Sequence, residues 1–81
     1  MNINIIKLNK SKVELGNLIN EGAIYIDASK IVKFQITKKW RTHELTLISF
    51  VNESYCIVSE TPNEIIELIN QINKKNKIDR L

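Results

Sequence analysis

The sequence predicts an α+β fold, in which a small antiparallel meander of about five strands packs against one C-terminal amphipathic helix. Two observations predict it: apolar and polar residues alternate in several segments before residue 60, and a helix-start signal followed by an apolar stripe comes after it. A chain of 81 residues has room for one domain. We assign residues 1–75 to that domain and expect residues 76–81 to form a short, frayed tail.

The N-terminal quarter has the least regular pattern. A strand is expected over residues 2–8, whose apolar side chains alternate onto both faces, so that the strand is either apolar on both sides or bulged. Residues 9–12 read as a polar turn, and Val13 and Leu15 as a short second strand. Gly16-Asn17 ends that strand, and two glycines favour a loop over residues 18–22, although a helical turn is the alternative there.

The middle of the chain predicts the remaining strands. Residues 23–26 form one strand, and residues 32–37 alternate in the way of a half-buried strand with a polar outer face. Residues 45–51 carry apolar side chains on both faces, which favours a central strand over an edge strand. Residues 55–59 alternate as well, and residues 51–54 can reverse the chain, so we expect a tight antiparallel pair.

The helix start is the clearest local signal. Thr61 can cap the helix with its hydroxyl, Pro62 suits the first helical position, and Glu64 completes a capping box. Apolar residues then recur with helical spacing, which predicts one helix packed by one face onto the sheet. These residues are Ile65, Leu68, Ile69 and Ile72, with Ile66 widening the stripe.

Composition bounds the class of protein. The net charge of +3 and pI near 9.1 permit an acidic partner without requiring one. Cys56 is the only cysteine, and the absence of a possible disulfide within the chain suits a reducing compartment. Cys56 itself is most simply a small buried hydrophobic residue. Neither a secretory leader nor a run long enough to cross a bilayer is recognisable, so we expect a cytoplasmic protein without membrane insertion.

The inventory of catalytic residues is thin. His43 is the only histidine, and the acidic residues form no evident pair. Gly16 and Gly22 lie too far apart for a phosphate-binding loop, and no spacing matches a zinc motif. We therefore predict a protein that is not an enzyme, with no catalytic, cofactor-binding or metal-binding residues and no cofactor.

One segment carries a binding signal. Lys38, Lys39 and Arg41 surround Trp40, the only tryptophan, between two predicted strands. The cations could neutralise phosphates while an exposed Trp40 stacks on an unpaired base, which would make residues 38–43 a nucleic-acid site. The favoured alternative is that Trp40 folds back to cover the core while the cations stay in water. A third is that Trp40 and Arg41 anchor a protein interface.

Four groups of segments, in their order along the chain, carry a resemblance to a known family. They are Ile5-Ile6-Lys7-Leu8-Asn9, Tyr25-Ile26-Asp27 with Ile31-Val32, Leu45-Thr46-Leu47, and Val58-Ser59-Glu60-Thr61-Pro62-Asn63-Glu64-Ile65-Ile66. Together they resemble the small FlbD-like flagellar proteins. The resemblance covers most of the chain, which departs from the family at residues 15–22 and has Asn52-Glu53 where a glycine turn is expected. It implies a short bacterial cytoplasmic protein linked to flagellar motor function and swarming, and it brings no catalytic residues.

Three functions follow as expectations. The first is a non-enzymatic protein-interaction module, self-associating as a homodimer or regulatory, because the chemistry is sparse and an open sheet in a small chain leaves edges to cover. The second is a nucleic-acid-binding module that uses Lys38, Lys39, Trp40 and Arg41. The third is a mobile-element inhibitor that blocks a host enzyme by binding it.

Overall fold

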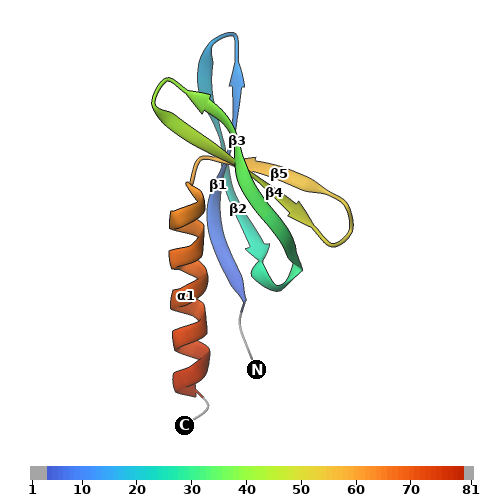
Figure 1. Ribbon diagram of the computed structural model, residues 1–81, viewed down its shortest axis with the longest axis vertical. Coiled ribbons are helices and arrows are strands. Elements are labelled where there is room, and N and C mark those ends of the chain that lie inside the picture. Colours follow the sequence, from blue (N-terminus) through green and yellow to red (C-terminus); the bar gives the residue numbers. More distant parts are fainter. Residues whose placement is uncertain (1–3, 80–81) are drawn as a thin grey trace.

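Five antiparallel strands and one C-terminal helix make up the computed structural model, which confirms the predicted α+β class (Figure 1). The structure describes residues 4–79, and their side chains through Lys74. The strands are longer than the sequence pattern predicts because several expected turns and loops are parts of strands. The elements are β1 (Ile5–Glu14), β2 (Asn17–Asp27), the short 3-10 helix η1 (Ala28–Lys30), β3 (Ile31–Trp40), β4 (His43–Phe50), β5 (Tyr55–Val58) and α1 (Pro62–Asp79).

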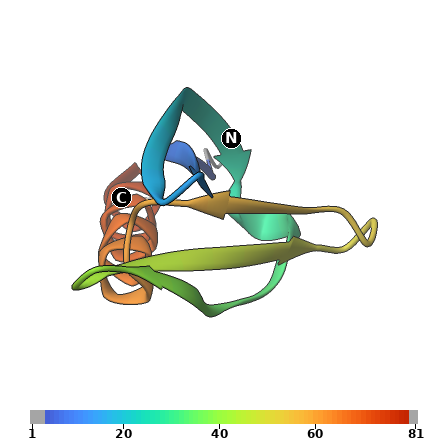
Figure 2. The same cartoon turned by 90° about the horizontal axis from the view of Figure 1, so that it is seen from above.

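The strands do not lie in chain order, as they would in a simple meander. Their order in the sheet is β2-β1-β5-β4-β3, so the β1–β2 hairpin and the β3–β4–β5 meander are joined where β5 pairs with β1. This pairing centres on Lys10 and Val58. Seen from above, β3, β4 and β5 lie side by side, with the β1–β2 hairpin beyond β5 and the helix at one end (Figure 2). As a result, β2 and β3 are the two edges of the sheet.

The β1–β2 hairpin corrects the prediction for the N-terminal segment. The residues expected as a polar turn at 9–12 belong to β1, and the segment expected as a loop at 18–22 belongs to β2. Continuous antiparallel pairing explains the difference, because the ladder satisfies backbone groups that a loop would leave to water. An irregularity in the register falls between Lys10 and Ser11, and Gly22 next to it adopts a φ of +102°. The glycine thus marks a bulge rather than a loop.

The pairing of β4 with β5 confirms the other half of the pattern. β4 lies between β3 and β5, as its two apolar faces predict. Its register places Ile48 opposite Cys56 and Thr46 opposite Val58. The chain reverses over residues 51–54, where the Phe50 N–H donates to the Ser54 carbonyl.

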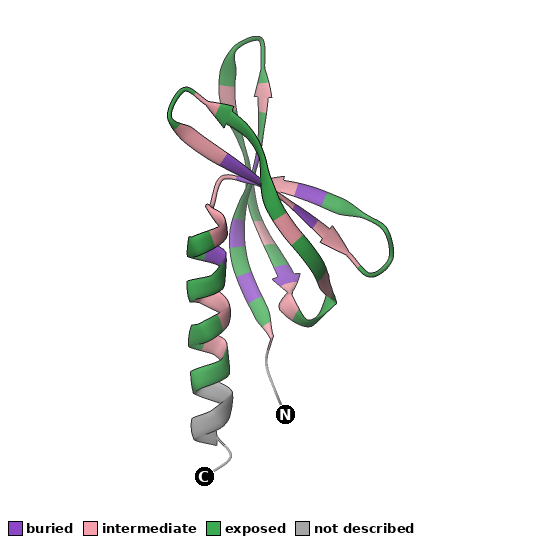
Figure 3. Ribbon diagram, in the orientation of Figure 1, coloured by how far each residue is buried: buried purple, intermediate pink, exposed green. Residues whose placement is uncertain are grey.

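The hydrophobic core lies where the sheet meets the helix (Figure 3). On β1, Ile6 and Leu8 are buried whereas Ile5 is exposed, and further along the strand Ser11 is buried as well. The buried strand residues come from β1 and β2 in one half of the sheet and from β4 and β5 in the other, so the core holds the two halves together. The buried cluster contains Ile6, Leu8, Ile26, Ile48, Cys56, Val58 and Ile65.

Helix α1 begins as the sequence predicts. The Glu64 N–H donates to the Thr61 hydroxyl and the Thr61 N–H donates to the Glu64 carboxylate, both at 3.2 Å, which is the reciprocal capping box. Ile65 is fully buried, and three further residues of the stripe pack against the core, namely Leu68, Ile69 and Ile72. Ile66 is exposed and does not widen the buried stripe. The helix continues past the expected boundary at residue 75 and ends at Asp79, while residues 80–81 of the expected tail lie outside the described residues.

Hydrogen bonds fasten the connection between β5 and α1 to the sheet. The Glu60 carboxylate accepts from the Asn9 side-chain amide at 2.8 Å and from the Asn9 N–H at 2.9 Å. The buried Thr46 hydroxyl donates to the Glu60 carbonyl at 2.6 Å, and His43 Nε2 lies 2.7 Å from the Ser59 carbonyl. The start of the helix is therefore held by both β1 and β4.

Candidate binding surface

Two hairpin turns meet at one end of the molecule and bring the predicted binding residues together with a turn far away in sequence (Figure 1). The indole Nε1 of Trp40, at the end of β3, donates a hydrogen bond of 2.9 Å to the carbonyl of Gly16, in the β1–β2 turn. We call this end the tip. Its residues are Leu15, Gly16, Lys38, Lys39, Trp40 and Arg41.

Trp40 is half-buried and lies outside the buried cluster of the core. The β3–β4 register pairs it with His43, and so puts it on the same face of the ladder as Leu45, which is fully buried. The Arg41 guanidinium lies over the indole ring, with its carbon 4.7 Å from the ring centroid, which is a cation–π distance. One ring face and the N–H of Trp40 are thus engaged within the chain.

The cations of the tip point into solvent. Lys38, Lys39 and Arg41 are exposed. Over the described part of the chain, ion pairs form between Lys12 and two carboxylates, those of Glu14 and Glu21, and none forms at Lys38, Lys39 or Arg41. The tip is therefore a positively charged surface without a counter-charge bound to it.

Two tip residues hold a backbone conformation that their side chains disfavour. Leu15 has a φ of 53° and Arg41 a φ of 58°, which is the left-handed region that Gly and Asn tolerate best. Leu15 and Gly16 both have positive φ, as a two-residue type I′ hairpin turn requires, and Asn-Gly is the preferred pair for such a turn. Leu15 is also 95% exposed, so no packing of its side chain compensates the strain.

The structure adds Leu15 and Gly16 to the four residues that the sequence singles out. Leu15 was expected to lie in a short strand, and instead it forms the turn. A leucine followed by glycine between two alternating segments was the available signal, but it is weak, because leucine rarely adopts a positive φ. Its position beside Trp40 depends on a hydrogen bond that joins residues far apart in sequence.

Among the titratable groups of the described residues, Cys56 and Asp27 have pKa values that their surroundings shift. Burial raises the pKa of the Cys56 thiol, which favours the unreactive neutral form. The pKa of Asp27 is lowered by the hydroxyl and the backbone N–H of Ser29, both of which donate to its carboxylate at the start of η1. No group of three or more His, Cys, Asp or Glu residues between residues 4 and 79 is arranged to hold a metal ion.

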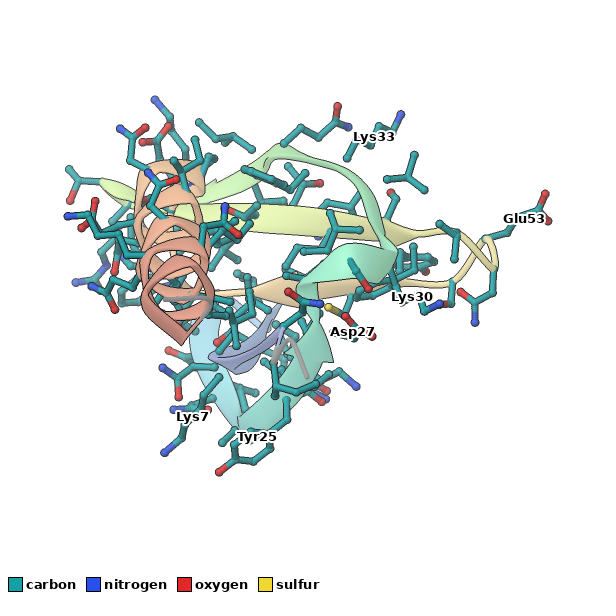
Figure 4. All side chains as sticks on the ribbon, turned by 90° about the horizontal axis from the view of Figure 1, so that it is seen from below. Lys7, Tyr25, Asp27, Lys30, Lys33 and Glu53 are labelled. Atoms are coloured by element: carbon teal, nitrogen blue, oxygen red, sulfur yellow. The ribbon has the colours of Figure 1, made fainter. Side chains whose placement is uncertain are left out.

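An apolar hollow of about 420 Å³ lies away from the tip, between the end of β2 and the β4–β5 turn. Asp27 and Lys30 lie close together on this side, and Tyr25 points outward (Figure 4). The hollow is open rather than enclosed, and its lining is mostly apolar, with Asp27, Lys30, Asn52 and Ser54 among its residues. Ile24, Ile26, Phe50 and Val51 contribute the apolar lining.

Comparisons with family models, with curated proteins and with solved structures found no match to the chain. The resemblance to the FlbD-like flagellar proteins therefore stays a prediction. In the described part of the chain, no helix combines the length and the apolar character that crossing a membrane would require. Because the comparisons found no match, the tip is characterised by its own geometry.

Proposed function

We propose that the protein is a small, non-enzymatic protein-binding module that contacts its partner through the tip. The observation that carries the proposal is the strained and almost fully exposed Leu15, in the turn whose Gly16 carbonyl is hydrogen-bonded to Trp40. Backbone strain at an exposed residue persists where function favours the side chain over stability. Tryptophan and arginine, which share the tip with Leu15, are residue types enriched among interface hot spots.

Contacts within the chain hold the tip residues in place for such an interaction. The Trp40–Gly16 hydrogen bond joins the two hairpins, and the Arg41 guanidinium lies over the indole ring. A partner that covers this surface therefore restricts fewer side-chain rotamers than it would on a free loop, which preserves affinity.

The test uses the full chain as bait and quantifies the retained partner by mass spectrometry. The variants Leu15→Asn and Arg41→Gly keep the positive φ that each turn requires, so the fold is retained while the exposed side chain is lost. Each is expected to weaken partner binding by about tenfold or more, the size expected for a hot-spot residue.

Glu53→Gly is the matched control. Glu53 also has a positive φ, 69°, and is exposed, but it lies in the β4–β5 turn rather than at the tip (Figure 4). This variant is expected to retain the partner. Equal retention by all three variants would rule out the tip as the contact surface.

Nucleic-acid binding is the second candidate, supported by the exposed Lys38, Lys39 and Arg41 around Trp40. It predicts that a short single-stranded oligonucleotide quenches Trp40 fluorescence at low salt and that added salt reverses the quenching. It is less favoured, because Arg41 already occupies one face of the indole and Gly16 its N–H. Unchanged Trp40 emission at low salt would remove this candidate.

A further inference from the structure

We propose that β3 accepts an acidic, extended polypeptide segment of the partner as an additional strand of the sheet. This inference rests on the proposed protein-binding function and names the chemistry of the partner. β3 ends the strand order β2-β1-β5-β4-β3, so one of its two sides has no neighbouring strand. Within the described residues, the strand ladder joins the backbone of β3 to β4 alone. An edge of this kind can pair with a further strand.

The charge of β3 selects an acidic occupant. From residue 28 to residue 43, a segment that includes all of β3, the chain contains no acidic residue. Glu44 of β4, opposite Lys39, is the nearest acidic residue in the ladder, and no ion pair forms between them. Opposite charges on neighbouring strands stabilise their pairing, whereas like charges oppose it. The basic residues of the segment are Lys30, Lys33, Lys38, Lys39 and Arg41.

The register of β3 also predicts the pattern of the incoming strand. Phe34 and Ile36 lie on the face that carries Ile48 and Thr46, while Lys33 and Gln35 lie on the opposite face. Ile36 is 47% exposed at the open side of the sheet, which leaves apolar surface for a neighbour to cover. An added strand that alternates apolar and acidic residues would match both faces of β3.

A second copy of the chain fits this edge less well. Pairing β3 with β3 would bring two basic edges together, which is electrostatically unfavourable. β2, the other edge, carries Glu21 and Asp27, but both carboxylates have partners within the chain: Glu21 lies 3.9 Å from Lys12, and Asp27 accepts from Ser29. The bulge at Gly22 further interrupts β2.

The experiment titrates the full chain with a short synthetic peptide that alternates valine with glutamate. Binding is followed by nuclear magnetic resonance of the backbone amides and by Trp40 fluorescence. The expected result is a set of shifts along residues 31–40, with cross-peaks between β3 and the peptide backbone. A peptide N-methylated on alternate residues, on the edge that would face β3, cannot donate the ladder hydrogen bonds and is expected to lose binding.

Charge variants test the selection for acid. Lys33 is exposed on β3 (Figure 4), and Lys33→Glu is expected to weaken the glutamate peptide by about threefold or more, the range of one cross-strand pair. Lys74→Glu, on the exposed side of α1, makes the same change in net charge away from β3 and is expected to leave the affinity within about twofold, as for a screened surface charge.

The other outcomes overturn the inference in recognisable ways. Equal binding of the N-methylated peptide would mean charge attraction without strand addition. Shifts confined to residues 38–41 would keep the tip as a protein-binding surface and reject the β3 edge. No response to the peptide, with concentration-dependent self-association, would make a second copy the occupant. Quenching by a single-stranded oligonucleotide alone would reject both this inference and the proposed protein-binding function.

Discussion

Leu15 shows how a single residue can be unfavourable for folding at the place where binding is proposed. Its φ of 53° places a leucine in the left-handed region, and its 95% exposed side chain gains no burial in return. We expect Leu15→Asn to raise the free energy of unfolding by about 1 kcal/mol, since asparagine tolerates this conformation. Urea denaturation followed by Trp40 fluorescence measures the change. Unchanged or reduced stability would show that the leucine is not strained.

Asp27 makes stability depend on acid pH. Its carboxylate accepts hydrogen bonds from Ser29, which lower its pKa from the ordinary value of 3.8. The stabilisation by Asp27 is therefore complete above pH 3.8 and is lost as the pH falls through the lowered pKa. We expect Asp27→Asn to be less stable than the natural chain at neutral pH, with a difference that shrinks in acid.

Denaturant titrations of the natural chain and of Asp27→Asn, between neutral pH and strong acid, test this pH dependence. Ser29→Ala serves as the control, because it removes one of the two donors and leaves the backbone N–H. Ser29→Ala should also lower the free energy of unfolding at neutral pH, but by less than Asp27→Asn does. A stability difference that does not vary with pH would mean that the charge of Asp27 contributes nothing.

At the scale of the element, α1 illustrates how adjacent residues of the same type have unequal effects. Ile65 is fully buried and Ile66 is 45% exposed. Ile65→Ala is expected to lower the free energy of unfolding by about 2–5 kcal/mol, because it leaves a cavity in the core. Ile66→Ala changes the same atoms on the exposed side and is expected to lower it by much less.

Chemical denaturation of the two variants compares them directly. The natural chain provides the reference, and circular dichroism confirms that each variant still folds before the titration. Equal losses at both positions would contradict the packing of the helix by one side, which the burial of Leu68, Ile69 and Ile72 also indicates.

For the whole molecule, the buried thiol provides a measure of opening. Cys56 lies in β5, the strand that joins the two halves of the sheet, and is 7% exposed. Burial raises its pKa, so both access and thiolate formation are suppressed in the folded state. We expect a disulfide reagent to label Cys56 far more slowly in the folded chain than in urea.

Ile65→Ala should accelerate this labelling, because a less stable fold opens more often. The readout is the absorbance of the released thiol reagent over time, with Ile66→Ala as the matched variant. Rapid labelling of the natural chain would show that the halves separate around β5 without global unfolding.

The prediction of the site from the sequence was incomplete for a physical reason. The composition around Trp40 identified Lys38, Lys39, Trp40 and Arg41, because cations beside a lone tryptophan are a local feature. Leu15 carried no such signal. It joins the surface only because the indole N–H reaches the Gly16 carbonyl across the fold.

Local sequence patterns determined the α+β class, the central place of β4 and the capping box at Thr61–Glu64. These features depend on alternation and hydrogen bonds between near neighbours. The pairing of β5 with β1, the extension of β1 and β2 through predicted turns, and the meeting of two hairpins at the tip were decided by the tertiary structure. Each arises from hydrogen bonds and burial between segments distant in sequence, and those interactions leave no periodic signal in either segment alone.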